Sequence, residues 1–170
     1  CFWCLGKIAG STDKTIPRAP PITMHQTFSG SSAPSPLLSA FATAAQVCAA
    51  LAQKITDQGI GAAMVISPAL GGLIVGHEVA RTLGLPHIFA EKENDKLVLR
   101  RGFEIKPGQK FIVAEDVVTR GGRVQETLDI VRAHQGNVLG VGMVVDRSNG
   151  QTQLGVPMVD FGGARLGVVL

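Results

Sequence analysis

The chain has 170 residues, of which 45% are hydrophobic and 17% are charged, and its formal net charge is +3 at pH 7. This length predicts one domain, and the composition is typical of a globular protein with a full apolar core. The weak charge is not gathered into basic runs, which disfavours a nucleic-acid-binding module. No apolar run reaches the ~18 residues that a membrane-spanning helix needs, so the sequence predicts no membrane partner either.

The three cysteines, Cys1, Cys4 and Cys48, form neither a disulfide framework nor a paired zinc motif. We therefore expect a reducing compartment and a cytoplasmic location. The chain begins with Cys1 in place of Met, and we expect it to be a fragment or a processed product. His77-Glu78 lacks the second His of HExxH, and neither GxxxxGK[ST] nor GxSxG occurs, which disfavours zinc peptidases, P-loop enzymes and serine hydrolases.

Residues 1–36 are rich in Pro and Ser and have no clear hydrophobic periodicity, so we predict an irregular segment that is either disordered or part of a small hood. Residues 37–170 form the predicted domain. Its alternating patterns predict an α/β fold with a mainly parallel five-stranded sheet and helices on both faces. Helices are expected at 40–58, 71–83 and 122–134, and strands at 62–67, 86–90, 96–101, 110–114, 138–146, 156–160 and 165–170.

The stretch from Phe111 to Arg123, FIVAEDVVTRGGR, carries the strongest chemical signal. It begins as a buried strand, places the paired carboxylates of Glu115 and Asp116 at the carboxyl end of that strand, and continues as a Gly-rich turn before a helix. Such a turn offers backbone N–H groups and a helix N-terminus to a phosphate. The carboxylates can accept hydrogen bonds from vicinal ribose hydroxyls. The stretch therefore predicts a site for a phosphorylated sugar.

Two further loops are expected at the same edge of the sheet. The segment from Ser67 to Gly72, SPALGG, follows a predicted strand and opens a helix, so its N–H groups can bind a second anion. Asp146 and Arg147 follow another predicted strand. Because ligands of such sheets lie beyond the carboxyl ends of the strands, we expect the three loops to converge. The only local density of cations, which suits an anionic small molecule, is formed by Lys92, Lys96, Arg100 and Arg101.

Residues 111–123 resemble the phosphoribosyl-pyrophosphate (PRPP) signature of the type I phosphoribosyltransferases, which is a strand, two acids, two aliphatics and a Thr/Ser/Gly run. From Ser67 to Arg147 the resemblance narrows to the orotate phosphoribosyltransferase branch, because SPALGG, FAEKE, LVLRRGF and VVDRSNG follow with the spacing of that branch. It implies the type I fold for residues 37–170, Mg²⁺ as the cofactor, and a homodimer that shares active-site loops. It also implies transfer of the phosphoribosyl group of PRPP to orotate, in pyrimidine biosynthesis.

The resemblance also implies roles for single residues. Lys96 and Asp116 take catalytic positions, while Thr119 and Arg147 take positions that bind orotate, with the guanidinium paired to its carboxylate. Mg²⁺ would be held by PRPP and water without a direct protein ligand, near Glu115 and Asp116. The positions implied for PRPP binding are Ala69, Leu70, Gly71, Lys92, Glu115, Asp116, Val117, Val118, Thr119, Arg120, Gly121, Gly122 and Arg123.

Several positions depart from the pattern of that family. Glu91 stands where the family has the first basic residue of a mobile loop, and Gly71 where many members carry a lysine. Arg120 and Arg123 replace the commoner Thr and Ser, and residues 29–35 keep only the Ser-Gly of a loop that lines the orotate pocket. A phosphoribosyltransferase for another base and a non-catalytic PRPP-binding regulatory homologue therefore stay open. The sequence also leaves open which loop lysine acts, where the natural termini lie and whether a decarboxylase partner exists.

Overall fold

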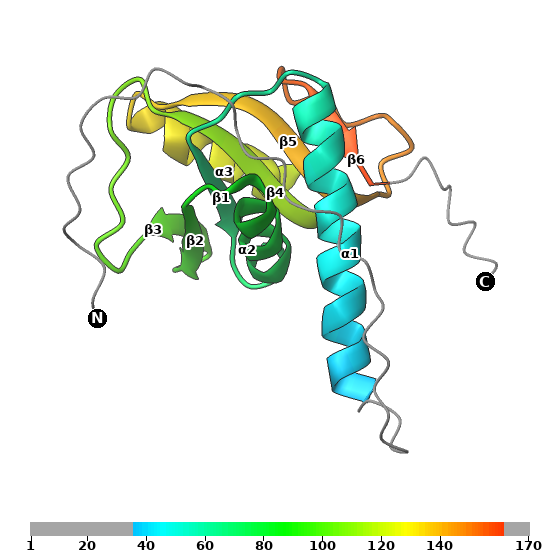
Figure 1. Cartoon of the computed structure of the whole chain (residues 1–170). Helices are drawn as coiled ribbons and strands as arrows, with labels where there is room; N and C mark the ends of the chain where they lie inside the picture. The colour runs from blue at the N-terminus through cyan, green and yellow to red at the C-terminus, as the bar shows by residue number, and fades with distance from the viewer. Residues whose placement is uncertain (1–35, 162–170) are drawn as a thin grey trace, which may run out of the picture. The chain divides into compact units, whose positions relative to one another are not determined.

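The computed structural model describes residues 36–161 (Figure 1). The predictions for the N-terminal segment, including the loop at 29–35, and for the strand at 165–170 concern residues outside this range. Within it, no helix is both long enough and apolar enough to cross a bilayer. The elements follow one another as α1 (Pro36–Asp57), β1 (Met64–Pro68), α2 (Gly72–Leu83), β2 (His87–Glu93), β3 (Lys96–Leu99), β4 (Lys110–Val118), α3 (Gly122–Ala133), β5 (Asn137–Asp146) and β6 (Met158–Asp160).

The strands form one sheet in the order β3-β2-β1-β4-β5-β6. All neighbours are parallel except β2 and β3, which pair antiparallel. The predicted α/β class and the mainly parallel sheet are confirmed, but the predicted number of five strands is wrong, because the sheet has six. Asn94 and Asp95 have φ values of 48° and 64°. Such left-handed residues form a two-residue turn, which folds β3 back onto β2 as an edge strand.

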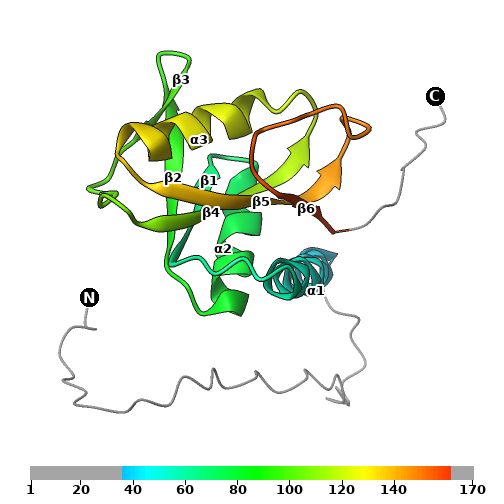
Figure 2. The ribbon, with the colours of Figure 1, turned by 90° about the horizontal axis from the view of Figure 1, so that it is seen from above.

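The helices cover both faces of the sheet, as predicted. In Figure 2, α3 lies on one side of the sheet and α1 and α2 lie on the other. Val124, Leu128 and Val131 recur at helical spacing on α3, and all three are buried in the core on its side. On the opposite side, Leu51 and Ile55 of α1 are buried with residues of α2 and the sheet.

The order of the strands reverses between β1 and β4. From β1 the chain passes through α2 to β2 on one side, and from β4 it passes through α3 to β5 on the other. The two central strands pair in parallel, with Met64 opposite Phe111, so their carboxyl ends lie side by side. Loops that leave neighbouring strands in opposite directions open a crevice, which is where ligands bind in such sheets.

Strand β4 is longer than the sequence predicted, and this moves the acidic pair into the strand. We predicted that the strand ends at Ala114, whereas it runs to Val118 because Glu115 and Val117 also pair with residues of β5. Successive side chains of a strand point to opposite faces. Glu115 is therefore buried, while the neighbouring Asp116 is partly exposed.

Leu128→Ala should lower the free energy of unfolding by about 3 kcal/mol, because it removes a fully buried side chain and leaves a cavity between α3 and the sheet. Urea unfolding followed by circular dichroism measures this change. Arg132→Ala on the same helix is the control: its guanidinium is exposed and lies 3.8 Å from Asp129, so its loss should cost less than ~0.5 kcal/mol. Equal effects of the two substitutions would contradict this assignment of the core.

Candidate active site at the carboxyl edge of the sheet

The loop after β1 packs directly against the two acids of β4. A Cβ atom on Gly71 would lie 2.8 Å from Oδ2 of Asp116, and one on Gly72 would lie 3.2 Å from Oε1 of Glu115. Real Cβ atoms rarely come so close to an oxygen, so glycine at these positions lets the backbone of the loop reach the carboxylates. The lysine that the family pattern often places at position 71 would require the Asp116 carboxylate to move.

The same loop is tied to the neighbouring strand β2. The backbone N–H of Ala69 donates a 2.7 Å hydrogen bond to the carbonyl oxygen of Ala90, and Pro68 pairs with Ala90 in the sheet register. The peptide bond between Ala69 and Leu70 is cis. These contacts place the predicted anion-binding segment from Ser67 to Gly72 at the carboxyl ends of β1, β2 and β4.

Glu115 is a buried acid with an unsatisfied oxygen. Its side chain is 2% exposed, and Oε1 accepts a 3.1 Å hydrogen bond from the N–H of Asp116. Within the described part of the chain, Oε2 is the only buried side-chain nitrogen or oxygen atom without a hydrogen-bond partner. Burial, followed by the adjacent Asp116 carboxyl, raises the pKa of Glu115 to about 8. Glu115 therefore holds a proton at neutral pH, and because Oε1 accepts the N–H of Asp116, this proton lies on Oε2, which can donate one hydrogen bond.

Asp116 is the more accessible of the two acids. Its Oδ1 accepts a 2.7 Å hydrogen bond from the N–H of Val117, and its Oδ2 faces Gly71. One carboxylate oxygen is thus fixed by the backbone, and the other faces the loop after β1. This is the geometry of an acceptor for a hydroxyl group bound in the crevice.

The turn after β4 leads into the N-terminus of α3. Gly121 has a φ of 73°, which favours glycine, and a Cβ atom there would lie 2.6 Å from Cγ2 of Thr152. The N–H of Gln125 makes the first helical hydrogen bond, to the carbonyl oxygen of Gly121, and no side chain caps the helix. The preceding amides, 122–124, have no intrahelical acceptor, so this end of α3 can bind an anion.

A cavity of about 700 Å³ lies beside this turn. Among the described residues, no carboxylate lines it, and neither Arg120 nor Arg147 makes an ion pair. The N–H of Arg147 donates a 2.8 Å hydrogen bond to the carbonyl oxygen of Val118, which holds this residue next to the turn. Such a positively charged cavity suits an anionic ligand. It is lined by Thr119, Arg120, Gly121, Gly122, Gln125, Arg147, Ser148, Asn149, Gln151, Thr152, Gln153 and Leu154.

The segment after Arg147 completes the cavity, and sequence reasoning missed it. Oδ1 of Asp146 accepts a 2.7 Å hydrogen bond from the N–H of Ser148, and hydrogen bonds from Ser148 lower the pKa of Asp146. Thr152 Oγ1 donates a 3.1 Å hydrogen bond to the carbonyl oxygen of Thr119. The run SNGQTQLG, which is rich in turn formers and amides, was the available signal.

The predicted cationic cluster on the β2–β3 hairpin is largely neutralised. Three of its four cations pair with acids of the same hairpin, and only Lys96 makes no ion pair with a described residue. Neither Lys92 nor Lys96 lines the cavity beside the turn, so the structure does not bring these two lysines together with Arg147. The three pairs are Lys92–Asp95 at 2.9 Å, Arg100–Glu93 at 3.3 Å and Arg101–Glu91 at 2.7 Å.

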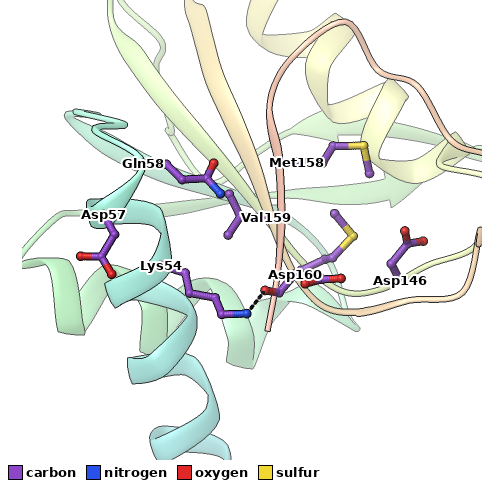
Figure 3. Close-up of a pocket in the computed structure, with 8 residues that line it drawn as sticks. Lys54, Asp57, Gln58, Asp146, Met158, Val159 and Asp160 are labelled. Atoms are coloured by element: carbon purple, nitrogen blue, oxygen red, sulfur yellow. Dashed lines mark hydrogen bonds between the residues drawn. The ribbon is translucent and has the colours of Figure 1, made fainter. Parts of the chain in front are cut away.

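A second cavity, of about 420 Å³, lies between the end of α1 and strands β5 and β6 (Figure 3). Lys54 Nζ donates a 3.1 Å hydrogen bond to the carbonyl oxygen of Asp160 there. Of the residues in the three predicted site loops, Asp146 lines this cavity, which mixes charged groups with methionine side chains. Its lining residues are Lys54, Asp57, Gln58, Met143, Asp146, Met158, Val159 and Asp160.

A mainly parallel sheet with two glycine-rich loops and an acidic pair at its switch point defines a phosphate-binding α/β domain. Residues 38–154 match the phosphoribosyl transferase domain family, and because this match covers more than half of the sequence, the chain belongs to that family. The resemblance predicted from residues 111–123 is thereby confirmed.

Within this family, the curated relatives that resemble the chain include orotate phosphoribosyltransferases. The chain is 49% identical over 111 residues to an orotate phosphoribosyltransferase of Desulforamulus reducens, and 51% identical over 110 residues to one of Pelotomaculum thermopropionicum. Each alignment covers 65% of this chain and 57% of the relative, so the chain spans little more than half the length of the curated relatives that it matches.

Solved structures show the same fold at low sequence identity. An adenine phosphoribosyltransferase superposes with a TM-score of 0.63 at 14% identity, covering 71% of this chain and 81% of its own. An orotate phosphoribosyltransferase from Aeropyrum pernix superposes with a TM-score of 0.56 at 20% identity, covering 73% of this chain and 71% of its own. The predicted type I phosphoribosyltransferase fold is therefore confirmed.

The raised pKa of Glu115 predicts a pH-dependent stability. The folded state keeps the proton of Glu115 up to about pH 8, whereas the unfolded chain releases it near pH 4.5, so the folded state binds more protons in this window. The free energy of unfolding should fall as the pH rises from about 4.5 to about 8, by up to about 1.4 kcal/mol per pH unit. Urea unfolding at pH 5.5, 7.0 and 8.5 measures this slope.

Glu115→Gln removes the titrating group and should flatten this dependence, so the variant gains stability relative to the wild type as the pH rises. The exposed Glu104→Gln is the control and should keep the wild-type slope. A Glu115→Gln variant whose stability falls with pH as steeply as the wild type would show that Glu115 is ionised in the folded protein.

Proposed function

We propose that the chain acts as an orotate phosphoribosyltransferase, which transfers the 5-phosphoribosyl group of PRPP to orotate in de novo pyrimidine biosynthesis. The products are orotidine 5′-phosphate and pyrophosphate. Two observations carry the proposal: the loop after β1 packs against the acidic pair, and one cavity joins the anion-binding turn to Arg147. The orotate phosphoribosyltransferases that are 49% and 51% identical to the chain over the aligned residues support orotate as the base.

The crevice offers a separate group to each part of PRPP. The amides at the start of α3, with Arg120 beside them, suit the 5-phosphate. Asp116 suits the ribose hydroxyls, because one of its oxygens is fixed by Val117 and the other faces the loop after β1. The loop from Ala69 to Gly71 packs against Asp116 through Gly71 and suits the pyrophosphate.

The reaction needs no covalent bond to the protein. The bond between C1 of the ribose and the pyrophosphate oxygen breaks, N1 of orotate forms the new bond to C1, and the proton of N1 is released. Positive charge grows on the ribose ring while pyrophosphate leaves. The residues of the crevice act by holding the two reactants in line and by placing acids under the ribose.

Mg²⁺ fits this site as a metal that arrives with the substrate. The described residues contain no cluster of three or more His, Cys, Asp or Glu residues that could hold a metal ion. The partly exposed Asp116 lies near the anion-binding turn, where a metal held by PRPP and water would be placed. Mg²⁺ commonly binds one or two carboxylates together with substrate phosphates and water. When bound, it would neutralise the charge of the departing pyrophosphate.

Orotate would be held by Arg147, with Thr119 touching the base. Both residues line the cavity of about 700 Å³, in which no carboxylate competes for the guanidinium. A planar guanidinium pairs with a planar carboxylate through two parallel hydrogen bonds. Of the bases that phosphoribosyltransferases use, orotate is one that carries such a carboxylate, so an unpaired arginine at this position favours orotate over a purine.

The family resemblance supports two further proposals. The chain would act in the cytoplasm as a homodimer in which the hairpin of one subunit reaches the active site of the other. Lys96 would then be the catalytic lysine, since it is the hairpin cation that no acid of the described residues neutralises.

The proposed activity is tested by mixing the purified chain with Mg²⁺, PRPP and orotate, uracil, adenine, hypoxanthine or guanine, and following nucleotide formation. We expect turnover of orotate alone. Asp116→Asn should lower kcat/KM about 10- to 100-fold, because hydrogen bonds to a charged group contribute about 1.5–3 kcal/mol. The exposed Asp129→Asn on α3 is the matched control and should keep full activity.

Each other outcome would replace the proposal with a definite alternative. Turnover of a different base would identify a phosphoribosyltransferase of another specificity. PRPP binding without turnover of any base would identify a non-catalytic PRPP-binding protein.

Arg147→Gln should raise the KM for orotate about 10- to 100-fold, because it removes a charge-assisted pair with the carboxylate. The KM for PRPP should change little, since Arg147 is not placed against the pyrophosphate loop. Steady-state kinetics with each substrate varied in turn separates the two effects, and Arg132→Gln on α3 is the control. An equal rise in both KM values would contradict the specific role of Arg147.

A further inference from the structure

The base of the β2–β3 hairpin is closed by an ion pair with two hydrogen bonds. Arg101 donates from Nη2 to Oε1 of Glu91 at 2.7 Å and from Nε to Oε2 at 2.9 Å. The hydrogen bond from Arg101 lowers the pKa of Glu91 below its usual range, so Glu91 is an anion at neutral pH. The carboxylate therefore meets the guanidinium in the same two-point geometry that a phosphate oxygen pair would adopt.

This ion pair lies next to the loop proposed to bind pyrophosphate. Glu91 directly follows Ala90, which pairs with Pro68 in the sheet and accepts the hydrogen bond of the Ala69 N–H. Glu91 is thus one residue away from Ala90, whose hydrogen bond with Ala69 fixes this loop. An anion bound to the loop would lie within reach of a long side chain at the hairpin base.

Aromatic packing holds Arg101 in this place without burying it. Its guanidinium carbon lies 5.9 Å from the ring centroid of Phe89, and Phe103 packs edge-on against the same ring at 5.1 Å. The Arg101 side chain is 63% exposed, whereas that of Glu91 is 22% exposed. The Arg101 side chain is therefore held against the Phe89 ring but stays accessible to solvent, so an anion can reach its guanidinium.

We propose that Arg101 is a further ligand of the pyrophosphate group and that Glu91 occupies its guanidinium until the oxygens of the ligand replace the carboxylate. This inference rests on the proposed function of the crevice. An exposed ion pair contributes little to stability, so the exchange of one oxygen pair for another costs little. A pyrophosphate carries more negative charge than one carboxylate and satisfies the same donors. Arg101 thereby supplies positive charge near position 91, where the sequence itself places an acid.

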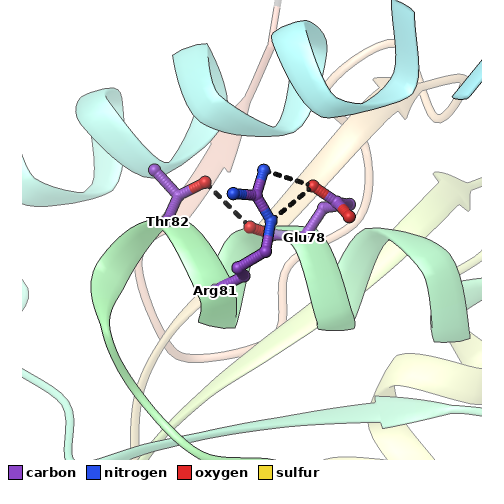
Figure 4. Close-up of polar contacts among 3 residues, drawn as sticks. All are labelled: Glu78, Arg81 and Thr82. Carbon is purple, nitrogen blue, oxygen red and sulfur yellow. Dashed lines mark hydrogen bonds and ion pairs between the residues drawn. The ribbon is translucent and has the colours of Figure 1, made fainter. Parts of the chain in front are cut away.

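The chain offers a matched ion pair away from this loop. On α2, Arg81 donates from Nη2 and Nε to Oε2 of Glu78, at 2.7 Å and 3.0 Å (Figure 4). Its guanidinium is about half exposed, and Glu78 is partly buried, as Glu91 is. A general effect of removing one surface carboxylate from the protein will therefore also be seen in Glu78→Gln.

The test is isothermal titration calorimetry of the full chain with inorganic pyrophosphate and Mg²⁺ at fixed ionic strength. Glu91→Gln should tighten binding about 2- to 5-fold, because it removes the competing carboxylate and leaves the guanidinium in place. Arg101→Gln should weaken binding about tenfold, because it removes a two-point charged contact. The double variant should bind as weakly as Arg101→Gln, since Glu91 acts only through Arg101. Glu78→Gln should bind as the wild type does.

Binding that is unchanged or weakened in Glu91→Gln, or unchanged in Arg101→Gln, would overturn the inference. A gain that persists in the double variant would overturn it as well. Melting temperatures of all variants separate these outcomes from a loss of folding. Orotate turnover by the wild type is measured alongside: failure of turnover with this binding pattern intact would count against the proposed reaction, whereas normal turnover without the pattern would count against Arg101 alone.

Discussion

The close approach of the loop after β1 to the acidic pair of β4 is the constraint on which the rest of the site depends. Gly71 and Gly72 bring the backbone so near to Asp116 and Glu115 that no side chain fits between them. This packing exists because β1 and β4 are neighbours whose connections leave in opposite directions. It places a loop for one anion directly over the carboxylates that suit a ribose. It also buries Glu115 deeply enough to raise its pKa to about 8.

The candidate site contains two kinds of cations: those without an ion pair to a described residue, at the turn after β4, and those paired with acids, on the β2–β3 hairpin. Arg120 and Arg147 line a cavity to which the described part of the chain contributes no carboxylate, so their positive potential is available to a ligand. On the hairpin, by contrast, the acids Glu91, Glu93 and Asp95 neutralise three cations. A permanent positive surface therefore lies at the turn, and a compensated one lies beside the loop after β1. We propose that the first binds the ligand, and that in the second the oxygens of the ligand replace the carboxylate of Glu91.

The sequence predicted the turn after β4 and the start of α3 better than the length of β4 itself. Residues 111–123 contain the acids, the glycines and the start of a helix within one short segment. Turn and helix signals act between residues that are close in sequence, so the turn and the N-terminus of α3 were predictable. The extension of β4 to Val118 was not, because it depends on pairing with β5, a strand more than 20 residues away. The cavity-forming run after Arg147 was missed for the same reason, since its place against Thr119 is a long-range contact. The functional roles of Lys92 and Lys96 remain predictions.

The sequence by itself determined which chemical groups the chain carries and where each lies relative to the end of a strand. It thereby determined the alternating α/β pattern, the anion-binding turn and the resemblance to the phosphoribosyltransferases. The tertiary structure alone decided that the sheet has six strands, that Glu115 is buried while Asp116 is partly exposed, and that Arg101 is paired with Glu91. The physical reason is that burial and ion pairing depend on neighbours distant in sequence, whereas turn and helix signals act over a few residues.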